Sequence, residues 1–295
     1  MYLICMKGYY NMDLTSPRTI RNIQEQFGFT FKKGLGQNFL TARNILEEIV
    51  DAAEIENGVI EVGPGFGVLT SELAQNSDKV VTIEIDERLI DVLDYTLAEY
   101  DNVKIINEDI LKLDLKKVID DEFNGEKVSI AANLPYYITT PIITKLLEEK
   151  LPIKNIVVMV QKEVAERMSA KPSTKDYGAI TVLCQYYTEP SIVANVPASL
   201  FVPPPKVDSA VLKLKILDKP SVEVKDEGVF FRVVKAAFSQ RRKTLLNCLS
   251  ANFPIPKDEI STLLESIGIA PSRRGETLSL EEFANIADTL LQKIK

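Results

Sequence analysis

The chain has 295 residues, of which 45% are hydrophobic and 26% are charged, with a net charge of −7. These values are typical of globular proteins and exclude a disordered or fibrous chain. Histidine is absent, which excludes histidine-based nucleophilic catalysis and histidine-ligated zinc. The three cysteines lie far apart, a spacing that favours reduced thiols, and no apolar run is long enough to cross a membrane. We therefore expect a cytoplasmic protein with no bound metal and no membrane partner.

Short β-branched segments alternate with helical patterns through the first two thirds of the chain. The predicted strands are Gly58–Val62, Lys79–Ile85, Val103–Glu108, Val128–Asn133, Asn155–Gln161, Ala179–Tyr186 and Ser209–Ile216. Helices predicted between them include Leu69–Gln75, Glu87–Tyr100 and Pro141–Glu149. Strands that alternate with helices imply crossover connections, so we expect a mostly parallel sheet with an antiparallel strand near one edge.

The pattern changes after residue 218. Phe201–Pro205 is a rigid extended segment, because its prolines lack amide donors. Downstream, the predicted helices are Glu227–Ala251, Lys257–Ile267 and Leu280–Lys293. We expect an α/β domain at residues 1–218 and a small all-α domain at 219–295. From Asp218 onward the chain has 12 Lys and Arg against 11 Asp and Glu, so the acidity lies upstream and a polyanion is a permitted partner of the second domain.

A glycine-rich turn follows the first predicted strand. Glu61 precedes Gly63, Gly65 and Gly67, a spacing that differs from the G-x-G-x-x-G of dinucleotide-binding folds. Glycines are needed where the backbone approaches a ligand closely or takes a positive φ. The spacing matches the E-x-G-x-G-x-G loop of class I methyltransferases.

Acidic residues end the next two predicted strands. Glu84 lies 21 residues after Gly63, where a carboxylate accepts hydrogen bonds from the ribose hydroxyls of an adenosine. Asp109 is placed to hold the adenine amino group. In open α/β sheets ligands bind outside the carboxyl ends of the strands, so we expect an adenosine-containing cofactor. A nicotinamide cofactor is the rival, and the glycine spacing disfavours it.

The fourth predicted strand ends in Asn133-Leu134-Pro135-Tyr136. The exocyclic amine of adenine is a poor nucleophile, because its lone pair is delocalised into the ring. The Asn133 oxygen can accept one amine proton, the carbonyl of Leu134 or Pro135 the other, and the Tyr136 ring can stack on the base. A sulfonium methyl donor needs neither a metal nor a strong base, in keeping with the absence of histidine. The alternative is an Asx turn followed by a loop Pro-Tyr.

Together these residues resemble the rRNA adenine N6,N6-dimethyltransferase family over nearly the whole chain. The resemblance implies a class I, Rossmann-like methyltransferase fold and S-adenosylmethionine as the cofactor. Residues 33–40, Lys-Gly-Leu-Gly-Gln-Asn-Phe-Leu, are similar to the family's signature before the first strand. The cofactor contacts expected from this resemblance and from the residues are Asn38, Leu40, Gly63, Gly65, Glu84, Ile85, Asp109, Ile110 and Asn133.

Residues 201–209 are similar to another motif of this family. By the resemblance, Phe201 covers the second face of the target adenine; alternatively it is a core anchor. The expected catalytic residues are Asn133, Leu134, Pro135, Tyr136 and Phe201. Tyr137 departs from the family pattern, in which we expect Asn.

The motifs also separate two branches of the family, one that modifies large-subunit rRNA and confers macrolide resistance and one that modifies small-subunit rRNA. Residues 133–136, the triple proline, and residues 237–243 and 273–279 resemble the small-subunit branch. The resemblance implies dimethylation of two adjacent adenines near the 3′ end of 16S rRNA. The alternatives are a large-subunit enzyme and a factor that acts mainly in ribosome assembly. A DNA methyltransferase is disfavoured by Leu134, where such enzymes usually have a second proline.

Two short runs of cations lie in the second predicted domain: Arg241, Arg242, Lys243, Arg273 and Arg274. We interpret them as phosphate contacts to the RNA of the small ribosomal subunit, which position a substrate without reading its sequence. The alternative is a solvated helix face with salt bridges. We expect a monomer that binds RNA and not DNA, and that selects its substrate largely by ribosomal shape.

Overall fold

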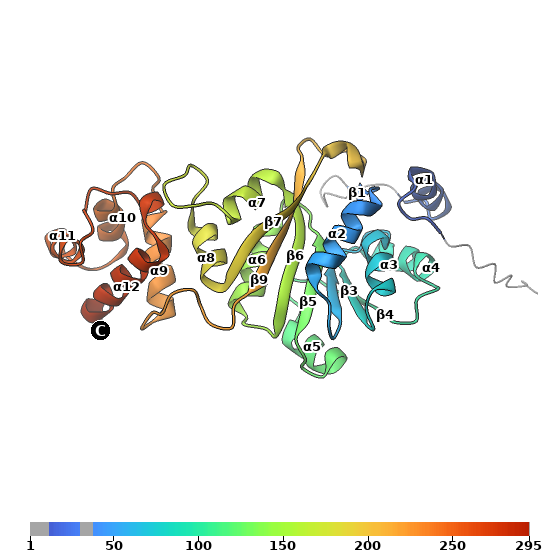
Figure 1. The fold of residues 1–295 in the computed structure, drawn as a ribbon, viewed down its shortest axis with the longest axis horizontal. Helices are drawn as coiled ribbons and strands as arrows, with labels where there is room; N and C mark the ends of the chain where they lie inside the picture. Colours follow the sequence, from blue (N-terminus) through green and yellow to red (C-terminus); the bar gives the residue numbers. More distant parts are fainter. Residues whose placement is uncertain (1–11, 30–37, 295) are drawn as a thin grey trace, which may run out of the picture. The chain divides into compact units, whose positions relative to one another are not determined.

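The structure, a computed structural model, describes residues 12–29 and 38–294 (Figure 1). Residues 33–37 of the predicted signature therefore lie outside the described residues. The chain groups into two compact units. One extends to Lys162 and takes in Val193–Lys213, and the other comprises Glu163–Ile192 and the chain from Leu214 onward. The division into functional domains at residue 218 stays a prediction.

A seven-stranded sheet has the strand order β4-β3-β2-β5-β6-β9-β7 (Figure 1). Its strands are β2 (Val59–Val62), β3 (Val80–Glu84), β4 (Val103–Asn107), β5 (Val128–Asn133), β6 (Ile153–Gln161), β7 (Thr188–Val196) and β9 (Ser209–Ile216). The five strands from β4 to β6 pair in parallel. Every residue of β2 is buried, as expected for a central parallel strand covered on both faces. The predicted Rossmann-like, mostly parallel α/β fold is confirmed.

Helices connect these strands, as the alternating pattern predicts. They are α2 (Arg43–Ala53), α3 (Val68–Gln75), η2 (Glu87–Leu89), α4 (Ile90–Thr96), α5 (Leu115–Phe123) and α6 (Thr139–Glu148), with α1 (Pro17–Gln26) before them. No helix of the described residues is long and apolar enough to span a membrane.

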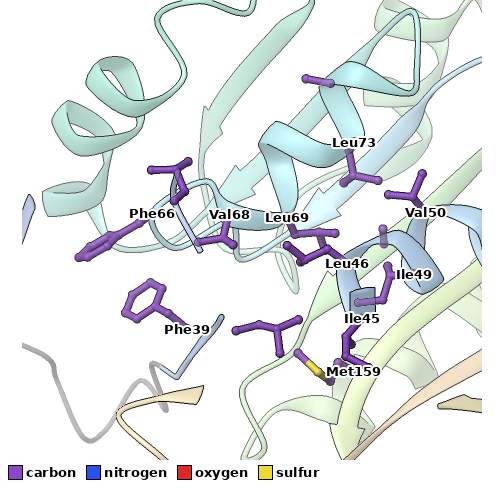
Figure 2. Close-up of a cluster of buried hydrophobic side chains, with 14 of the residues drawn as sticks. Phe39, Ile45, Leu46, Ile49, Val50, Phe66, Val68, Leu69, Leu73 and Met159 are labelled. Carbon is purple, nitrogen blue, oxygen red and sulfur yellow. The ribbon is translucent and has the colours of Figure 1, made fainter. Parts of the chain in front are cut away.

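The apolar core beside β2 holds α2 and α3 together. Figure 2 shows Leu46 and Ile49 of α2 close to Leu69 of α3. At the other end of this cluster the rings of Phe39 and Phe66 stack with their centroids 4.3 Å apart. Phe66 lies inside the glycine-rich turn, so hydrophobic packing fixes the turn that the sequence marks as a ligand loop.

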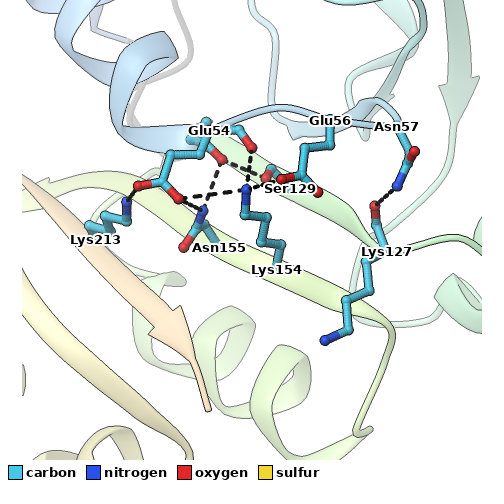
Figure 3. Close-up of polar contacts among 9 residues, drawn as sticks. Glu54, Glu56, Asn57, Lys127, Ser129, Lys154, Asn155 and Lys213 are labelled. Atoms are coloured by element: carbon cyan, nitrogen blue, oxygen red, sulfur yellow. Dashed lines mark hydrogen bonds and ion pairs between the residues drawn. The ribbon is translucent and has the colours of Figure 1, made fainter. Parts of the chain in front are cut away.

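A polar network fixes the carboxyl end of α2 (Figure 3). Ser129 Oγ and Asn155 Nδ2 donate to the carbonyl oxygen of Ala53 at 2.6 and 3.0 Å. Glu54, in the left-handed region with φ 47°, accepts a 2.6 Å hydrogen bond from Lys213 Nζ. The Ser129 and Asn155 bonds satisfy a helix-terminal carbonyl, and the three bonds together join the end of α2 to β5, β6 and β9.

The predicted strand Ala179–Tyr186 is wrong. These residues form α8 (Ala179–Tyr187), which follows α7 (Lys162–Met168). The β-branched composition favours a strand, but the helix buries Val182, Cys184 and Tyr186, and such packing overrides propensity. The strand in this part of the chain is β7, which begins directly after α8 and was not predicted. β7 contains Pro190 and lies at the sheet edge, where a missing amide is tolerated.

The chain from residue 227 onward is helical, as predicted, but its first helix is divided. The elements are α9 (Glu227–Ala237), α10 (Leu245–Asn252), α11 (Lys257–Ser266), η4 (Gly275–Thr277) and α12 (Leu280–Ile294). The predicted helix Glu227–Ala251 is therefore wrong across residues 238–244. Thr244 caps α10, its hydroxyl accepting from the Asn247 amide, so a new helix begins there. Arg241, Arg242 and Lys243 consequently lie in a loop and not on a helix face.

Two further elements complete the first unit. η3 (Ala198–Leu200) leads into β8 (Phe201–Val202), which pairs antiparallel with β1 (Phe39–Leu40). Thr41 Oγ1 donates to the Leu200 carbonyl at 2.8 Å beside this pairing. The extended segment predicted at 201–205 is thus partly a short strand outside the main sheet.

Candidate active site

A cavity opens at the carboxyl ends of β2, β3, β4 and β5. All nine predicted cofactor contacts line it: Asn38, Leu40, Gly63, Gly65, Glu84, Ile85, Asp109, Ile110 and Asn133. Leu134, Pro135 and Tyr136 line it as well. The ends of four strands, from Val62 of β2 to Asn133 of β5, therefore converge, as the parallel topology requires.

The glycines of the turn serve two different purposes. Gly63, Gly65 and Gly67 have φ values of 72°, 59° and 83°, which side-chain-bearing residues rarely adopt. A Cβ on Gly65 would lie 2.7 Å from Phe39 Cε1, so this glycine is required for packing. A Cβ on Gly63 would meet no atom of the described residues within 4 Å, although the residue lines the cavity. Gly63 therefore leaves its backbone open for the close approach of a ligand.

Two carboxyl groups are buried beside this turn. Burial raises the pKa of Glu84 to about 7, although the Asp86 amide donates to it at 2.8 Å. Burial likewise raises the pKa of Glu61 to about 8, although Thr70 Oγ1 donates to it at 2.5 Å. Within residues 12–29 and 38–294 no Lys or Arg forms an ion pair with either group. When ionised, these two carboxyls have no cationic partner among the described residues, and a positively charged cofactor such as S-adenosylmethionine would supply one.

Sequence reasoning assigned Glu61 no role beyond its place in the glycine motif. It is 1% exposed and lines the cavity, so its carboxyl belongs to the site. The only available signal was an acidic residue inside an otherwise apolar strand, Val-Ile-Glu-Val, because a charged side chain is seldom fully buried without a partner.

The third strand end supplies a polar and an apolar group. One Asp109 oxygen accepts from the Leu111 amide at 3.0 Å, and the other lies 3.8 Å from Lys112 Nζ. Ile85 is 54% exposed, unusual for an aliphatic side chain that lines a cavity. Together they offer an apolar surface with an acceptor at its edge, the features that an adenine ring and its amino group need.

The Asn133 turn presents two oxygens that no described residue donates to. Asn133 Nδ2 donates to the Asn38 carbonyl at 3.0 Å, which leaves Asn133 Oδ1 as the free end of the amide. The Pro135 carbonyl accepts from both the Ile138 amide and Thr139 Oγ1 at 3.2 Å. In the part of the chain that the structure describes, neither Asn133 Oδ1 nor the Leu134 carbonyl accepts a hydrogen bond. Of the two carbonyls that the sequence left open, Leu134 is the one available.

The two predicted aromatic partners differ in their surroundings. Tyr136 lines the cavity, and its hydroxyl lies 2.8 Å from Ser209 Oγ on β9, an anchor that the sequence did not reveal. Burial raises the pKa of this phenol. Phe201 is 3% exposed, packs in the apolar core and is absent from the described cavity lining. The geometry thus favours the alternative interpretation of Phe201, a core anchor.

The five predicted RNA contacts divide into paired and unpaired cations. Arg273 makes a bidentate ion pair with Glu282 and donates to the Thr277 carbonyl, and its hydrogen bond lowers the pKa of Glu282. Arg241 donates to the Lys175 carbonyl and lies 3.8 Å from Glu276. Arg242, Lys243 and Arg274 are exposed and have no acidic partner among the described residues.

Comparison with known proteins places the chain in a family. The family model for ribosomal RNA adenine dimethylase matches residues 28–292. Ribosomal RNA small subunit methyltransferase A of Bacillus mycoides (strain KBAB4) is 54% identical over 285 residues, which cover 95% of this chain and 98% of the relative.

Two solved structures are also similar. A dimethyladenosine transferase from Plasmodium falciparum has a TM-score of 0.70 and 29% identity, covering 84% of this chain and 95% of that one. The 23S rRNA methyltransferase ErmE has a TM-score of 0.65 and 28% identity, covering 86% and 100%. The matched family model and the site geometry agree. The chain therefore belongs to the ribosomal RNA adenine dimethylase family, whose members depend on S-adenosylmethionine.

Proposed function

We propose that this protein dimethylates the N6 amines of two adjacent adenines near the 3′ end of small-subunit rRNA. The Asn133 turn carries the proposal, because it offers two unpaired acceptor oxygens at the cavity. The 54% identity to a relative named for the small subunit, against 28% to a 23S rRNA enzyme, favours the small-subunit substrate.

In the proposed mechanism the chain positions and polarises the amine. S-adenosylmethionine, when bound, supplies an electrophilic methyl group on a positively charged sulfur. Asn133 Oδ1 and the Leu134 carbonyl each accept a hydrogen bond from N6–H, which draws the lone pair out of the ring and onto nitrogen. The new C–N bond would form as the bond between the methyl carbon and sulfur breaks, with S-adenosylhomocysteine as the leaving group, and one N6 proton would then pass to solvent. Orientation and fixed dipoles thus supply the rate enhancement.

The cofactor and the base have separate supports in this proposal. Glu84 receives the ribose hydroxyls, Asp109 and Ile85 hold the adenine of the cofactor, and Gly63 allows its close approach. The Tyr136 ring, held by Ser209, stacks on one face of the target base, a contact worth about 1–3 kcal/mol.

The exposed cations contact RNA phosphates in this proposal. Arg242, Lys243 and Arg274 have no acidic partners among the described residues, and a contacting phosphate would neutralise them. Arg273, already paired with Glu282, holds the neighbouring loop. The protein acts as a monomer in the cytoplasm, where small subunits are assembled.

The test uses small ribosomal subunits that lack the adenine modification. These subunits are incubated with the protein and S-adenosylmethionine, and the adenines are located and quantified by mass spectrometry. We expect two dimethylated adenines side by side near the 3′ end. Large subunits and protein-free 16S rRNA serve as controls. Methylation of the large subunit instead, or of neither subunit, would refute the proposal.

A further inference from the structure

Tyr137 is a large aromatic residue whose ring has no partner in the part of the chain that the structure describes. It is 58% exposed and lines the cavity beside Tyr136. Within residues 12–29 and 38–294 it makes no hydrogen bond and no ring contact. Packing within the described residues therefore does not explain an aromatic side chain at this position of the cavity. The family motif does not explain it either, because the motif has Asn there.

The backbone beneath this ring is fixed. The Ile138 amide and Thr139 Oγ1 both donate to the Pro135 carbonyl, which closes a turn directly before α6. Leu134 N donates to the Met159 carbonyl at 3.1 Å, which ties the start of the turn to β6. Tyr137 thus extends an exposed ring from a fixed main chain. Stacking on this ring therefore requires little loss of backbone entropy.

Its neighbour Tyr136 supplies the contrast. The Tyr136 ring is anchored through its hydroxyl to Ser209 and is partly buried, as a support for a base inside the cavity should be. Tyr137 follows it by one residue, about 3.8 Å along the backbone, and is mostly exposed. The two rings therefore serve different depths of the same opening.

We propose that Tyr137 stacks on the nucleotide adjoining the target adenine and so positions the RNA for methylation; this rests on the proposed function. An adenine that enters the cavity must leave its stack, which exposes a face of the neighbouring base. An aromatic ring at the mouth can cover that face, since every base has a π-surface and needs no matched hydrogen bond.

This arrangement suits a substrate with two adjacent target bases. Whichever adenine is inside, its neighbour remains outside at the mouth, and a stacking contact does not distinguish an adenine from its dimethylated form by hydrogen bonding. One ring can therefore support both rounds of methylation, whereas a hydrogen-bonding reader of N6 would fail after the first.

The first test compares Tyr137→Ala, Tyr137→Phe and Tyr137→Trp on unmodified small subunits. Loss of one base–aromatic stack should raise the KM for subunits about 5- to 150-fold in Tyr137→Ala, with kcat at saturation kept. The Phe and Trp variants should stay within about threefold of the parent, since both keep a stacking ring. Calorimetric affinity for S-adenosylhomocysteine should not change in any variant.

Tyr95→Ala is the matched control. Tyr95 is 43% exposed and lies on α4, where its ring packs 5.5 Å from Phe27, away from the cavity lining. The KM of the Tyr95→Ala variant for small subunits should equal that of the parent.

The second test places the photo-reactive p-benzoylphenylalanine at position 137 and maps cross-links on the small subunit by primer extension. The expected cross-link is at a nucleotide next to either target adenine. A KM for Tyr137→Ala equal to the parent, a Phe variant as impaired as Ala, or cross-links confined to other nucleotides would overturn the inference. Failure of the parent protein to methylate adenine at all would instead overturn the proposed function.

Discussion

Asn133 Nδ2 donates a 3.0 Å hydrogen bond to the main-chain oxygen of Asn38, which lies 95 residues earlier in the chain. This bond fixes the orientation of the Asn133 side-chain amide. Its donor end is occupied, so its acceptor end is left for a substrate, and no rotation of the amide is needed when RNA arrives. The same bond ties the edge of the predicted signature segment to the end of β5.

The Asn133→Ala substitution tests the acceptor directly. We expect single-turnover methylation of small subunits to fall about 10²- to 10³-fold, the loss typical of a preorganised polar group at the reacting centre. The control is Asn57→Ala, because Asn57 Nδ2 also donates to a distant main-chain oxygen, that of Lys127, at 3.1 Å (Figure 3). Equal activity of the two variants would contradict the mechanism.

The raised pKa of Glu84 predicts a pH-dependent cofactor affinity. Only the carboxylate accepts both ribose hydrogen bonds, and with a pKa of about 7 the ionised fraction rises about tenfold from pH 6 to pH 8. Calorimetry should therefore show S-adenosylhomocysteine binding about tenfold tighter at pH 8. Glu84→Gln should bind weakly with little pH dependence, and a flat profile in the parent would exclude this role.

The same shift has the opposite sign for the stability of the free protein. A carboxyl whose pKa in the folded protein exceeds its ordinary value of 4.5 stabilises the fold fully below pH 4.5, and this contribution is lost as pH rises through about 7. Thermal unfolding of the cofactor-free protein should show Glu84→Gln gaining on the parent between pH 5 and pH 8. A constant difference across this range would contradict the burial effect.

Alanine substitutions at Gly63 and Gly65 should have different effects on stability and on cofactor affinity. Gly65→Ala places a methyl group 2.7 Å from the Phe39 ring in addition to the left-handed strain of about 1 kcal/mol, so the melting temperature should fall. Gly63→Ala carries only the strain but extends into the cavity, so cofactor affinity should fall by more than stability does. Differential scanning calorimetry and cofactor titration of both variants would separate these effects; identical profiles would not fit.

Substitutions of the cations in the second unit should likewise separate effects on RNA binding from effects on stability. Lys243→Ala should leave the melting temperature unchanged, weaken subunit binding and reduce the slope of log affinity against log salt by about 1. Arg273→Ala breaks the ion pair with Glu282 and should lower the melting temperature at pH 7, with the difference shrinking as Glu282 is protonated at low pH. Loss of RNA affinity in Arg273→Ala with an unchanged melting temperature would reverse the assignment.

The mostly parallel sheet and the functional residues at its strand ends were predictable, because parallel α/β units repeat an apolar strand followed by a ligand-binding turn. Gly63, Glu84, Asp109 and Asn133 each end or follow a strand, so the sequence alone placed them at one edge of the sheet. Their convergence on a single cavity required no further information.

Other features depend on contacts that sequence spacing does not encode. The helix at Ala179–Tyr187 has a strand-like composition, and it is helical because packing buries most of its central residues. The interruption at residues 238–244 depends on the Thr244 cap, which periodicity overlooks. Ser209 as the partner of Tyr136, and Glu282 as the partner of Arg273, are side-chain pairs that become visible only in three dimensions.

The pairing of β1 with β8 bears on how the protein is made. Leu40 lies opposite Phe201, and Thr41 bonds to Leu200 across 159 residues of sequence. During translation the early strand leaves the ribosome long before its partner exists, and such distant contacts close late in folding. A nascent chain released before residue 201 therefore lacks both the β1–β8 pairing and the Ser209 hydroxyl that anchors Tyr136. We expect such truncated products to have no methyltransferase activity.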